Sequence, residues 1–113
     1  MKTKQICREY FNTKKKIKAL QLKLKYSAKL SYSEKLDLEQ KMTMDKMFIA
    51  KVDEGLKVLR EITQEHDYEM FYLKYFQNKT LNYLAITFGY AGPSSFWRRL
   101  DGCAREFEDI LNT

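Results

Sequence analysis

The feature that most constrains the fold is the stretch TLNYLAITFGYAGPSSFWRRL, which has the pattern of two helices joined by a glycine turn. Thr80 is expected to cap the first helix, because its hydroxyl can accept a hydrogen bond from a free backbone N–H. Gly89 stands where a helix would end in the left-handed conformation. Pro93 suits the entry to the second helix, with Ser94 or Ser95 as its cap.

Apolar residues recur at helical spacing on both sides of this turn. They are Leu81, Leu84, Ala85 and Phe88 in the first helix and Phe96, Leu100, Cys103, Phe107 and Ile110 in the second. The polar side chains that this leaves off the stripe are Ser94, Ser95, Arg98, Arg99 and Arg105. Two helices, a glycine turn and an exposed polar start to the second helix describe a helix-turn-helix.

The remaining composition predicts an all-α protein. The chain has 113 residues, 44% of them hydrophobic, with one proline and four glycines, which is enough for one domain with a modest core. We expect an N-terminal helical hairpin or coiled-coil-like arm over residues 1–64 and a helix-turn-helix domain over 65–113. No apolar run approaches the roughly 18 residues of a membrane span, and residues 1–20 lack the apolar core of a signal peptide.

The first expected helix is strongly basic. Its apolar side alternates steps of four and three, the seam spacing of a coiled coil, through Ile6, Tyr10, Thr13, Ile17, Leu20, Leu24 and Ser27. Residues 1–30 carry ten basic residues and one acid, a net charge of +9, whereas residues 63–113 have a net charge of −2. The lysines either keep a solvated helix soluble or contact a phosphate backbone. The candidates for phosphate contact are Lys14, Lys15, Lys16 and Lys18. A membrane-surface role is disfavoured by the narrow apolar face, which has no tryptophan.

A second long helix is expected from Ser31, whose pairing with Glu34 matches a capping box. Helical spacing continues through Leu38, Met42, Ile49, Val52, Leu56, Leu59 and Ile62, with Asp45 interrupting the seam and Gly55 weakening the helix. The soft apolar residues Met42, Met44, Met47 and Phe48 favour a core or a dimer seam over a partner groove. The sequence leaves open whether the two N-terminal helices form an antiparallel hairpin or a dimerising stalk.

A third, aromatic helix is expected to begin near Asp67 as its N-cap. One broad face carries Tyr68, Phe71, Tyr72 and Tyr75. Such rings can stack on single-stranded bases, but the favoured interpretation is that they fill the core behind the helix-turn-helix.

From Asp67 onward the chain resembles the C-terminal module of small phage-encoded transcription regulators of the ArpU and RinA kind, a module similar to region four of primary sigma factors. The matching features are Lys74-Tyr75, Lys79-Thr80, Ala85 and Gly89-Tyr90, and Glu9-Tyr10-Phe11 near the start. The segment GYAGPSSFWRRL is also similar to the recognition-helix segment of AraC-type activators, through Gly89, Tyr90, Ser94, Phe96 and Arg98.

The resemblance implies sequence-specific binding of double-stranded DNA by a transcriptional regulator. The heptad-like spacing of the N-terminal helices favours a homodimer through these helices. Residue chemistry is compatible, since a recognition helix enters the major groove by its N-terminal end and arginine can pair with guanine. The residues expected at DNA are Ser94, Ser95, Arg98, Arg99 and Arg105, with Thr80 and Lys79 at phosphates. The alternative for Arg98 and Arg99 is ion pairing with Asp101, Glu106 or other local acids. Trp97 is expected to flank the core, a groove edge or an interface.

Catalysis is not expected, because the chain has one histidine, no metal-ligand cluster, no phosphate-binding glycine loop and no nucleophile elbow. No cofactor, metal or small-molecule substrate is expected. Two isolated cysteines indicate a reducing cytosol, and Cys103 is expected in the core. The resemblance to phage regulators implies that this cytosol is that of a bacterial host. The alternative function is a protein-binding inhibitor or adaptor that contacts RNA polymerase, a repressor or another host protein, using Trp97 or the segment 42–48.

Overall fold

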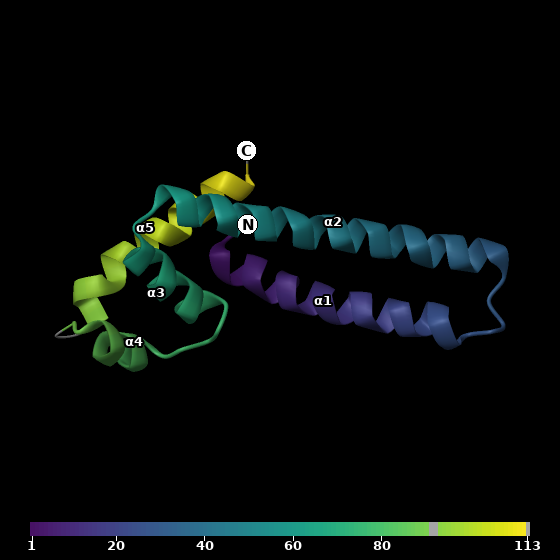
Figure 1. Ribbon diagram of the computed structural model, residues 1–113, viewed down its shortest axis with the longest axis horizontal. Helices are drawn as coiled ribbons and strands as arrows, with labels where there is room; N and C mark the ends of the chain where they lie inside the picture. Colours follow the sequence, from purple (N-terminus) through teal and green to yellow (C-terminus); the bar gives the residue numbers. More distant parts are fainter. Residues whose placement is uncertain (91–92, 113) are drawn as a thin grey trace.

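The computed structural model describes residues 1–90 and 93–112, with the backbone alone for 93–95, and over this range every regular element is a helix (Figure 1). The expected all-α class is therefore confirmed. The elements in chain order are α1 (Thr3–Tyr26), α2 (Tyr32–Ile62), α3 (Glu65–Tyr75), α4 (Leu81–Phe88) and α5 (Pro93–Leu111). None of these helices is long and apolar enough to cross a membrane.

The first two helices form an antiparallel hairpin along the long axis of a molecule that measures 60 × 28 × 19 Å (Figure 1). Between these helices lies the expected seam of α1, where Thr13, Ile17, Leu20 and Leu24 are half-buried and the lysines around them are exposed. Within one chain, the arrangement is thus the hairpin that the sequence left open. The oxygen of Ser31 accepts the N–H of Glu34 at 3.1 Å and caps α2, as expected.

One hydrophobic core joins the base of the hairpin to α3, α4 and α5. It contains Ile6, Cys7 and Tyr10 from α1, Val52, Leu56 and Leu59 from α2, Met70 and Phe71 from α3, Leu84 and Ala85 from α4, and Phe96, Leu100, Cys103, Ala104, Phe107 and Leu111 from α5, together with Phe76. The core therefore continues across position 64, where the arm was expected to meet the second domain. Cys103 lies in this core, as expected.

The aromatic helix α3 contributes to this core, as favoured from the sequence. Phe71 is fully buried, and its ring centroid lies 5.4 Å from that of Phe107. The rings of Tyr68, Tyr72 and Tyr75 are half-buried against the same cluster. The ring of Tyr72 stacks on those of Tyr68 and Phe76 within the protein.

Some apolar residues of α2 lie outside the core of the single chain. Met44 and Met47 are 71% and 67% exposed, and Ile62 is 57% exposed. Met42 and Phe48 are half-buried. The reason is that only one stripe of α2 faces α1 and α5, so a run of apolar residues across several helical positions cannot all turn inward. Met44 and Met47 therefore lie outside the core of the single chain, and the alternative of a dimer seam stays a prediction.

Polar contacts fasten α1 to its neighbours. The backbone N–H and the hydroxyl of Thr3 donate to Oε2 of Glu108 on α5, at 2.9 and 2.6 Å. The hydroxyl of Tyr10 donates to Oδ1 of Asp53 on α2 at 2.7 Å. The start of α1 is thereby held against both α2 and α5, which fixes its position beside the helix-turn-helix.

Candidate nucleic-acid interface

Helix α4 and the turn after it form as the sequence predicts. The hydroxyl oxygen of Thr80 accepts the N–H of Tyr83 at 3.0 Å. Gly89 ends the helix with φ 75° and ψ 26°, in the left-handed region that favours glycine. The N–H of Tyr90 then donates to the carbonyl of Ala85 at 2.9 Å. These contacts fix where the chain leaves α4.

The second helix of the motif, α5, begins at Pro93. Ser94 and Ser95 therefore belong to its first turn, and neither is the cap that we expected. A proline suits this place because the first helical N–H has no intrahelical partner to lose. The side chains of Ser94 and Ser95 lie outside the described part of the chain. Phe96 and Leu100 are fully buried and anchor the helix on the core.

The exposed side of the first turns of α5 carries an aromatic residue and two cations. Trp97 is 43% exposed, and Arg98 and Arg99 are both exposed. Among the described residues, Arg98 forms no ion pair. Arg99 does, since its Nη1 lies 3.3 Å from Oδ1 of Asp67 on α3. The alternative of ion pairing with a nearby acid thus describes Arg99, and the acid comes from another helix.

Asp67 has a different role from the one expected of it. Helix α3 begins at Glu65, with Gln64 at the N-cap position, so Asp67 lies in the first turn and is not the cap. An acid in the first turn is favourable, because its charge faces the positive end of the helix dipole. Asp67 also places a carboxylate beside one of the two arginines expected to contact DNA.

Two candidate phosphate contacts lie at the start of α4. Thr80 is exposed, and its hydroxyl hydrogen remains available as a donor while its oxygen caps the helix. Nζ of Lys79 lies 5.1 Å from the ring centroid of Tyr83, which holds the ammonium over the start of the helix. The structure thus brings Lys79 and Thr80 together at one helix N-terminus, where backbone N–H groups also favour an anion.

Arg105 is separated from this surface along α5. It lies two turns after Arg98, about 10 Å along the helix. Its Nε is 3.0 Å from Oδ2 of Asp101, four residues earlier on the same helix. Both side chains are largely solvent-exposed, so the pair stabilises the helix only weakly.

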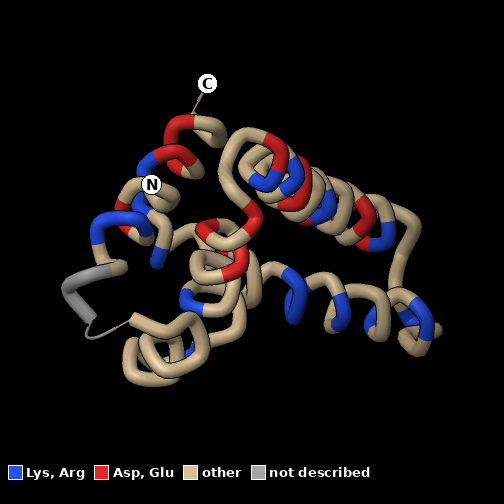
Figure 2. The backbone as a smooth tube through the Cα atoms, turned by 60° about the vertical axis from the view of Figure 1, so that its left-hand side comes forward, with Lys and Arg blue, Asp and Glu red and all other residues tan. Residues whose placement is uncertain are grey.

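The lysines Lys14, Lys15, Lys16 and Lys18 are exposed on the part of α1 that follows Glu9, where the tube in Figure 2 carries basic residues and no acid. This part of the hairpin extends away from α3, α4 and α5, whereas α5 begins at the opposite end of the long axis (Figure 1). Nζ of Lys14 lies 4.5 Å from the ring centroid of Tyr10. The structure therefore does not bring the arm lysines and the start of α5 onto one small surface.

Sequence reasoning overlooked Ile86, which is 82% exposed on α4, and the neighbouring Tyr83, which is 43% exposed. The helical stripe could have indicated them, because both fall off the line of Leu84 and Phe88. An isoleucine with this exposure is an unusual surface residue for a helix that packs on a core.

The two thiols are not reactive groups in this fold. Burial raises the pKa of Cys7 to about 12 and that of Cys103 to about 11. Both are therefore protonated near neutral pH, and the thiol is a much weaker nucleophile than the thiolate. Within the described residues, no group of three His, Cys, Asp or Glu side chains is arranged to hold a metal ion.

Comparison with known proteins gives no relative. No protein-family model matches the chain, and no curated protein or solved structure matches it.

Proposed function

We propose that this protein is a sequence-specific DNA-binding regulator of transcription that inserts the start of α5 into the major groove. The observation that carries the proposal is the start of α5 itself. Buried Phe96 and Leu100 hold the helix rigidly, while Arg98 projects from the same turns with no ion pair to another described residue. An arginine on an anchored helix, with an uncommitted guanidinium, can donate two hydrogen bonds to O6 and N7 of a guanine.

The start of α4 supports this arrangement. Thr80 and Lys79 supply donors for a backbone phosphate, and a phosphate contact positions the protein without reading sequence. Arg99 contributes less than Arg98, because Asp67 already neutralises it at 3.3 Å. Ser94, Ser95 and Arg105 complete the set of residues that we expected at DNA.

The wider proposal follows the resemblance to phage regulators. In it the protein acts in the bacterial cytosol as a homodimer, and it binds DNA without catalysis. Dimer contacts would use the exposed outer side of the hairpin, where Met44 and Met47 are uncovered. The lysines of α1 would add affinity through non-specific phosphate contacts that weaken as salt rises.

Selection from a random duplex pool at two salt concentrations tests the proposal. We expect a defined motif to be enriched. Arg98→Ala should weaken binding to that motif by about tenfold, the effect of one guanine contact worth roughly 1–3 kcal/mol. Arg60→Ala is the matched control, because Arg60 is exposed on α2 and is paired with Glu65. Binding without sequence preference at either salt concentration would contradict the proposal.

The competing function is protein binding, and the exposed apolar residues Tyr83, Ile86 and Trp97 favour it. Aromatic residues at the centre of an interface commonly carry much of its binding energy. A partner such as RNA polymerase or a repressor would then be captured by the wild-type protein and lost with Ile86→Ser and Trp97→Ala. Under the DNA proposal, Ile86→Ser leaves motif binding within about twofold, a typical surface substitution effect.

A further inference from the structure

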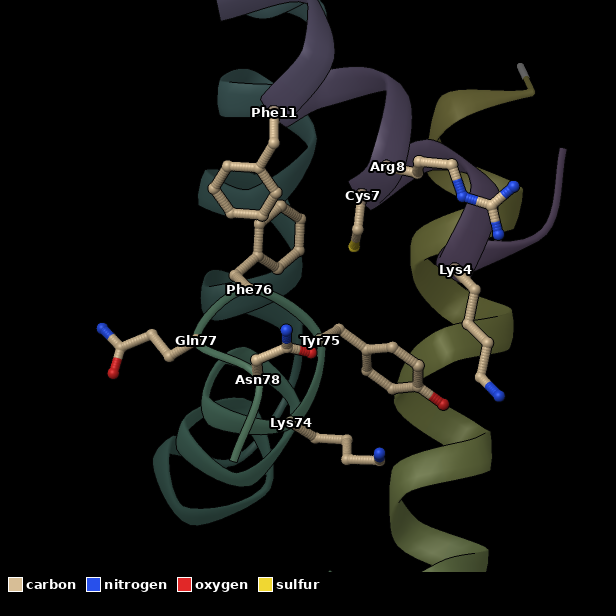
Figure 3. Close-up of a pocket in the computed structure, with 9 residues that line it drawn as sticks. All are labelled: Lys4, Cys7, Arg8, Phe11, Lys74, Tyr75, Phe76, Gln77 and Asn78. Atoms are coloured by element: carbon tan, nitrogen blue, oxygen red, sulfur yellow. The ribbon is translucent and has the colours of Figure 1, made fainter. Parts of the chain in front are cut away.

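A recess of about 700 Å³ lies between the start of α1 and the end of α3, on the side chains shown in Figure 3. Lys4 and Arg8, one helical turn apart, enter it from α1. Lys74 enters from the last turn of α3, and Gln77 and Asn78 follow from the next loop. Residues far apart in the sequence thus line one recess with three cations, whereas the side chain of Gln77 points away from them (Figure 3).

None of the described residues that line this recess is an acid. Among the described residues, Lys4, Arg8 and Lys74 form no ion pair. The nearby acids of α5 are already engaged, since Glu108 accepts two hydrogen bonds from Thr3 and Asp101 pairs with Arg105. Like charges gathered without a counter-ion repel one another, and a bound anion would relieve that repulsion.

The cations come from two helices, Lys4 and Arg8 from α1 and Lys74 from α3, which suits an anion with several oxygens. A guanidinium matches two phosphate oxygens, and an ammonium acts as a compact point charge. The amide NH₂ group of Asn78 can add a neutral donor. A carboxylate offers only two oxygens in one plane, whereas a phosphate offers more oxygens for donors on α1 and α3.

The loop that forms one wall is held in a defined shape. Asn78 has φ 57°, a left-handed conformation that asparagine tolerates. The N–H of Lys79 donates to the carbonyl of Leu73 at 3.0 Å. The floor is less polar, with Tyr75, buried Phe76 and Cys7 beneath the charged groups. These constraints fix the backbone of the loop beside Lys74, whereas Lys4 and Arg8 are exposed on α1.

We propose that this recess binds a phosphate group, supplied either by a nucleic-acid backbone or by a free phosphorylated small molecule. The loop leads directly to Lys79 and Thr80 at the start of α4, so an occupied recess adjoins the proposed phosphate contacts there. The site itself does not depend on the reading of DNA by α5.

The first experiment is a two-dimensional amide NMR titration of the full chain with inorganic phosphate, at ionic strength held constant with potassium chloride. We expect saturable shifts confined to residues 4–8 and 74–79, with a dissociation constant in the millimolar range. The double variant Arg8→Gln/Lys74→Gln should weaken this binding at least tenfold. Lys46→Gln/Lys57→Gln is the matched control, because it removes two exposed cations from α2 and should change the constant by less than twofold.

The proposal is overturned if the Arg8→Gln/Lys74→Gln variant binds phosphate within twofold of wild type, or if the shifts spread over all lysines alike. The amide spectra of both double variants show directly that they are folded. Arg98→Ala should leave phosphate binding unchanged, so failure of the recess and failure of the DNA-reading proposal are distinguishable.

A second arm identifies the source of the phosphate, using a short DNA duplex in phosphate-free buffer. If the recess variant loses duplex affinity beyond the α2 control and inorganic phosphate competes with the duplex, the ligand is backbone phosphate. If it loses only phosphate binding and retains duplex affinity, the ligand is a free phosphorylated small molecule. Both outcomes support the site. If no duplex binds to the wild-type protein, the titration with inorganic phosphate still decides whether the recess binds a phosphate group.

Discussion

Gly55 lies so close to Leu111 that a β-carbon at position 55 would be 2.7 Å from Cδ2 of Leu111. The absence of a side chain on α2 therefore allows the end of α5 to approach. Glycine in a helix interior otherwise costs about 1 kcal/mol relative to alanine. Here that loss is offset by a close helix crossing in the core.

Gly55→Ala should consequently have opposite effects in two backgrounds. In wild type, overpacking against Leu111 cancels or exceeds the gain in helix propensity, and we expect unchanged or lower stability. With Leu111→Ala also present, the same change should stabilise by about 0.5–1 kcal/mol. Chemical denaturation of the four proteins gives the coupling between the two sites. Equal effects of Gly55→Ala in both backgrounds would contradict the close approach.

Gly89 and Gly102 should respond oppositely to alanine. At Gly89, φ is 75° and no neighbouring atom would obstruct a β-carbon, so strain comes from backbone conformation alone. We expect Gly89→Ala to destabilise by about 1–2 kcal/mol. Gly102 lies exposed inside α5 with open space around it, and Gly102→Ala should stabilise by up to about 1 kcal/mol. Thermal unfolding of both variants checks the signs, and a loss of stability in both would be inconsistent with this assignment.

Glu108 should make stability depend on pH. Burial raises the pKa of this carboxyl, but the hydrogen bonds from Thr3 and the charge of Lys2 outweigh burial and hold it below its ordinary value. A lowered folded-state pKa means that the stabilisation is complete above the unfolded-state pKa and is lost as pH falls through the folded-state pKa. We expect Glu108→Gln to destabilise by about 1–2 kcal/mol at pH 7, with the difference from wild type shrinking below about pH 4.5.

Denaturation midpoints of wild type and Glu108→Gln between pH 3 and pH 7 measure this effect. Glu106→Gln, an exposed change on the same helix, controls for removing one acid from α5. A difference between wild type and Glu108→Gln that stays constant over this range would refute the prediction.

Asp67→Asn should strengthen DNA binding under the proposed function. The change releases Arg99 from its 3.3 Å ion pair and removes a negative charge beside the proposed interface. An exposed ion pair is worth at most about 1 kcal/mol, so the gain should reach at most about fivefold in affinity. Fluorescence anisotropy with the selected duplex measures it. Asp67→Asn in an Arg99→Ala background is the control, and a gain of the same size there would assign the effect to general charge alone.

Sequence patterns predicted the structural features that depend on residues close together in the chain. The ends of α4 follow from a hydroxyl three residues from its N–H partner and from one glycine in the left-handed conformation. The buried stripe of α5 follows from spacing, because residues three and four apart share a helix face. The seam of α1 was predictable for the same reason. The core then required only that these faces meet.

Contacts between distant residues were not predictable from such patterns. The pairing of Arg99 with Asp67 joins positions 32 residues apart, and it changes which arginine is uncommitted at the interface. A glycine is needed at position 55 because Leu111 packs against it, and the cationic recess forms because Lys74 lies beside α1. These relationships arise only after the helices pack, so a single sequence carries no spacing that indicates them.

The burial along the hairpin is uneven, and its dynamics should be uneven as well. Ile6 and Tyr10 are almost fully buried near the base, whereas Ile17, Leu20 and Leu24 are only half-buried further out. Because local opening requires less free energy where fewer apolar contacts must be broken, the outer turns should separate without unfolding the rest. Amide hydrogen exchange should accordingly be fastest near residues 27–31 and should slow progressively toward the base of the hairpin. The free end of the hairpin then opens locally while the core at its base stays folded.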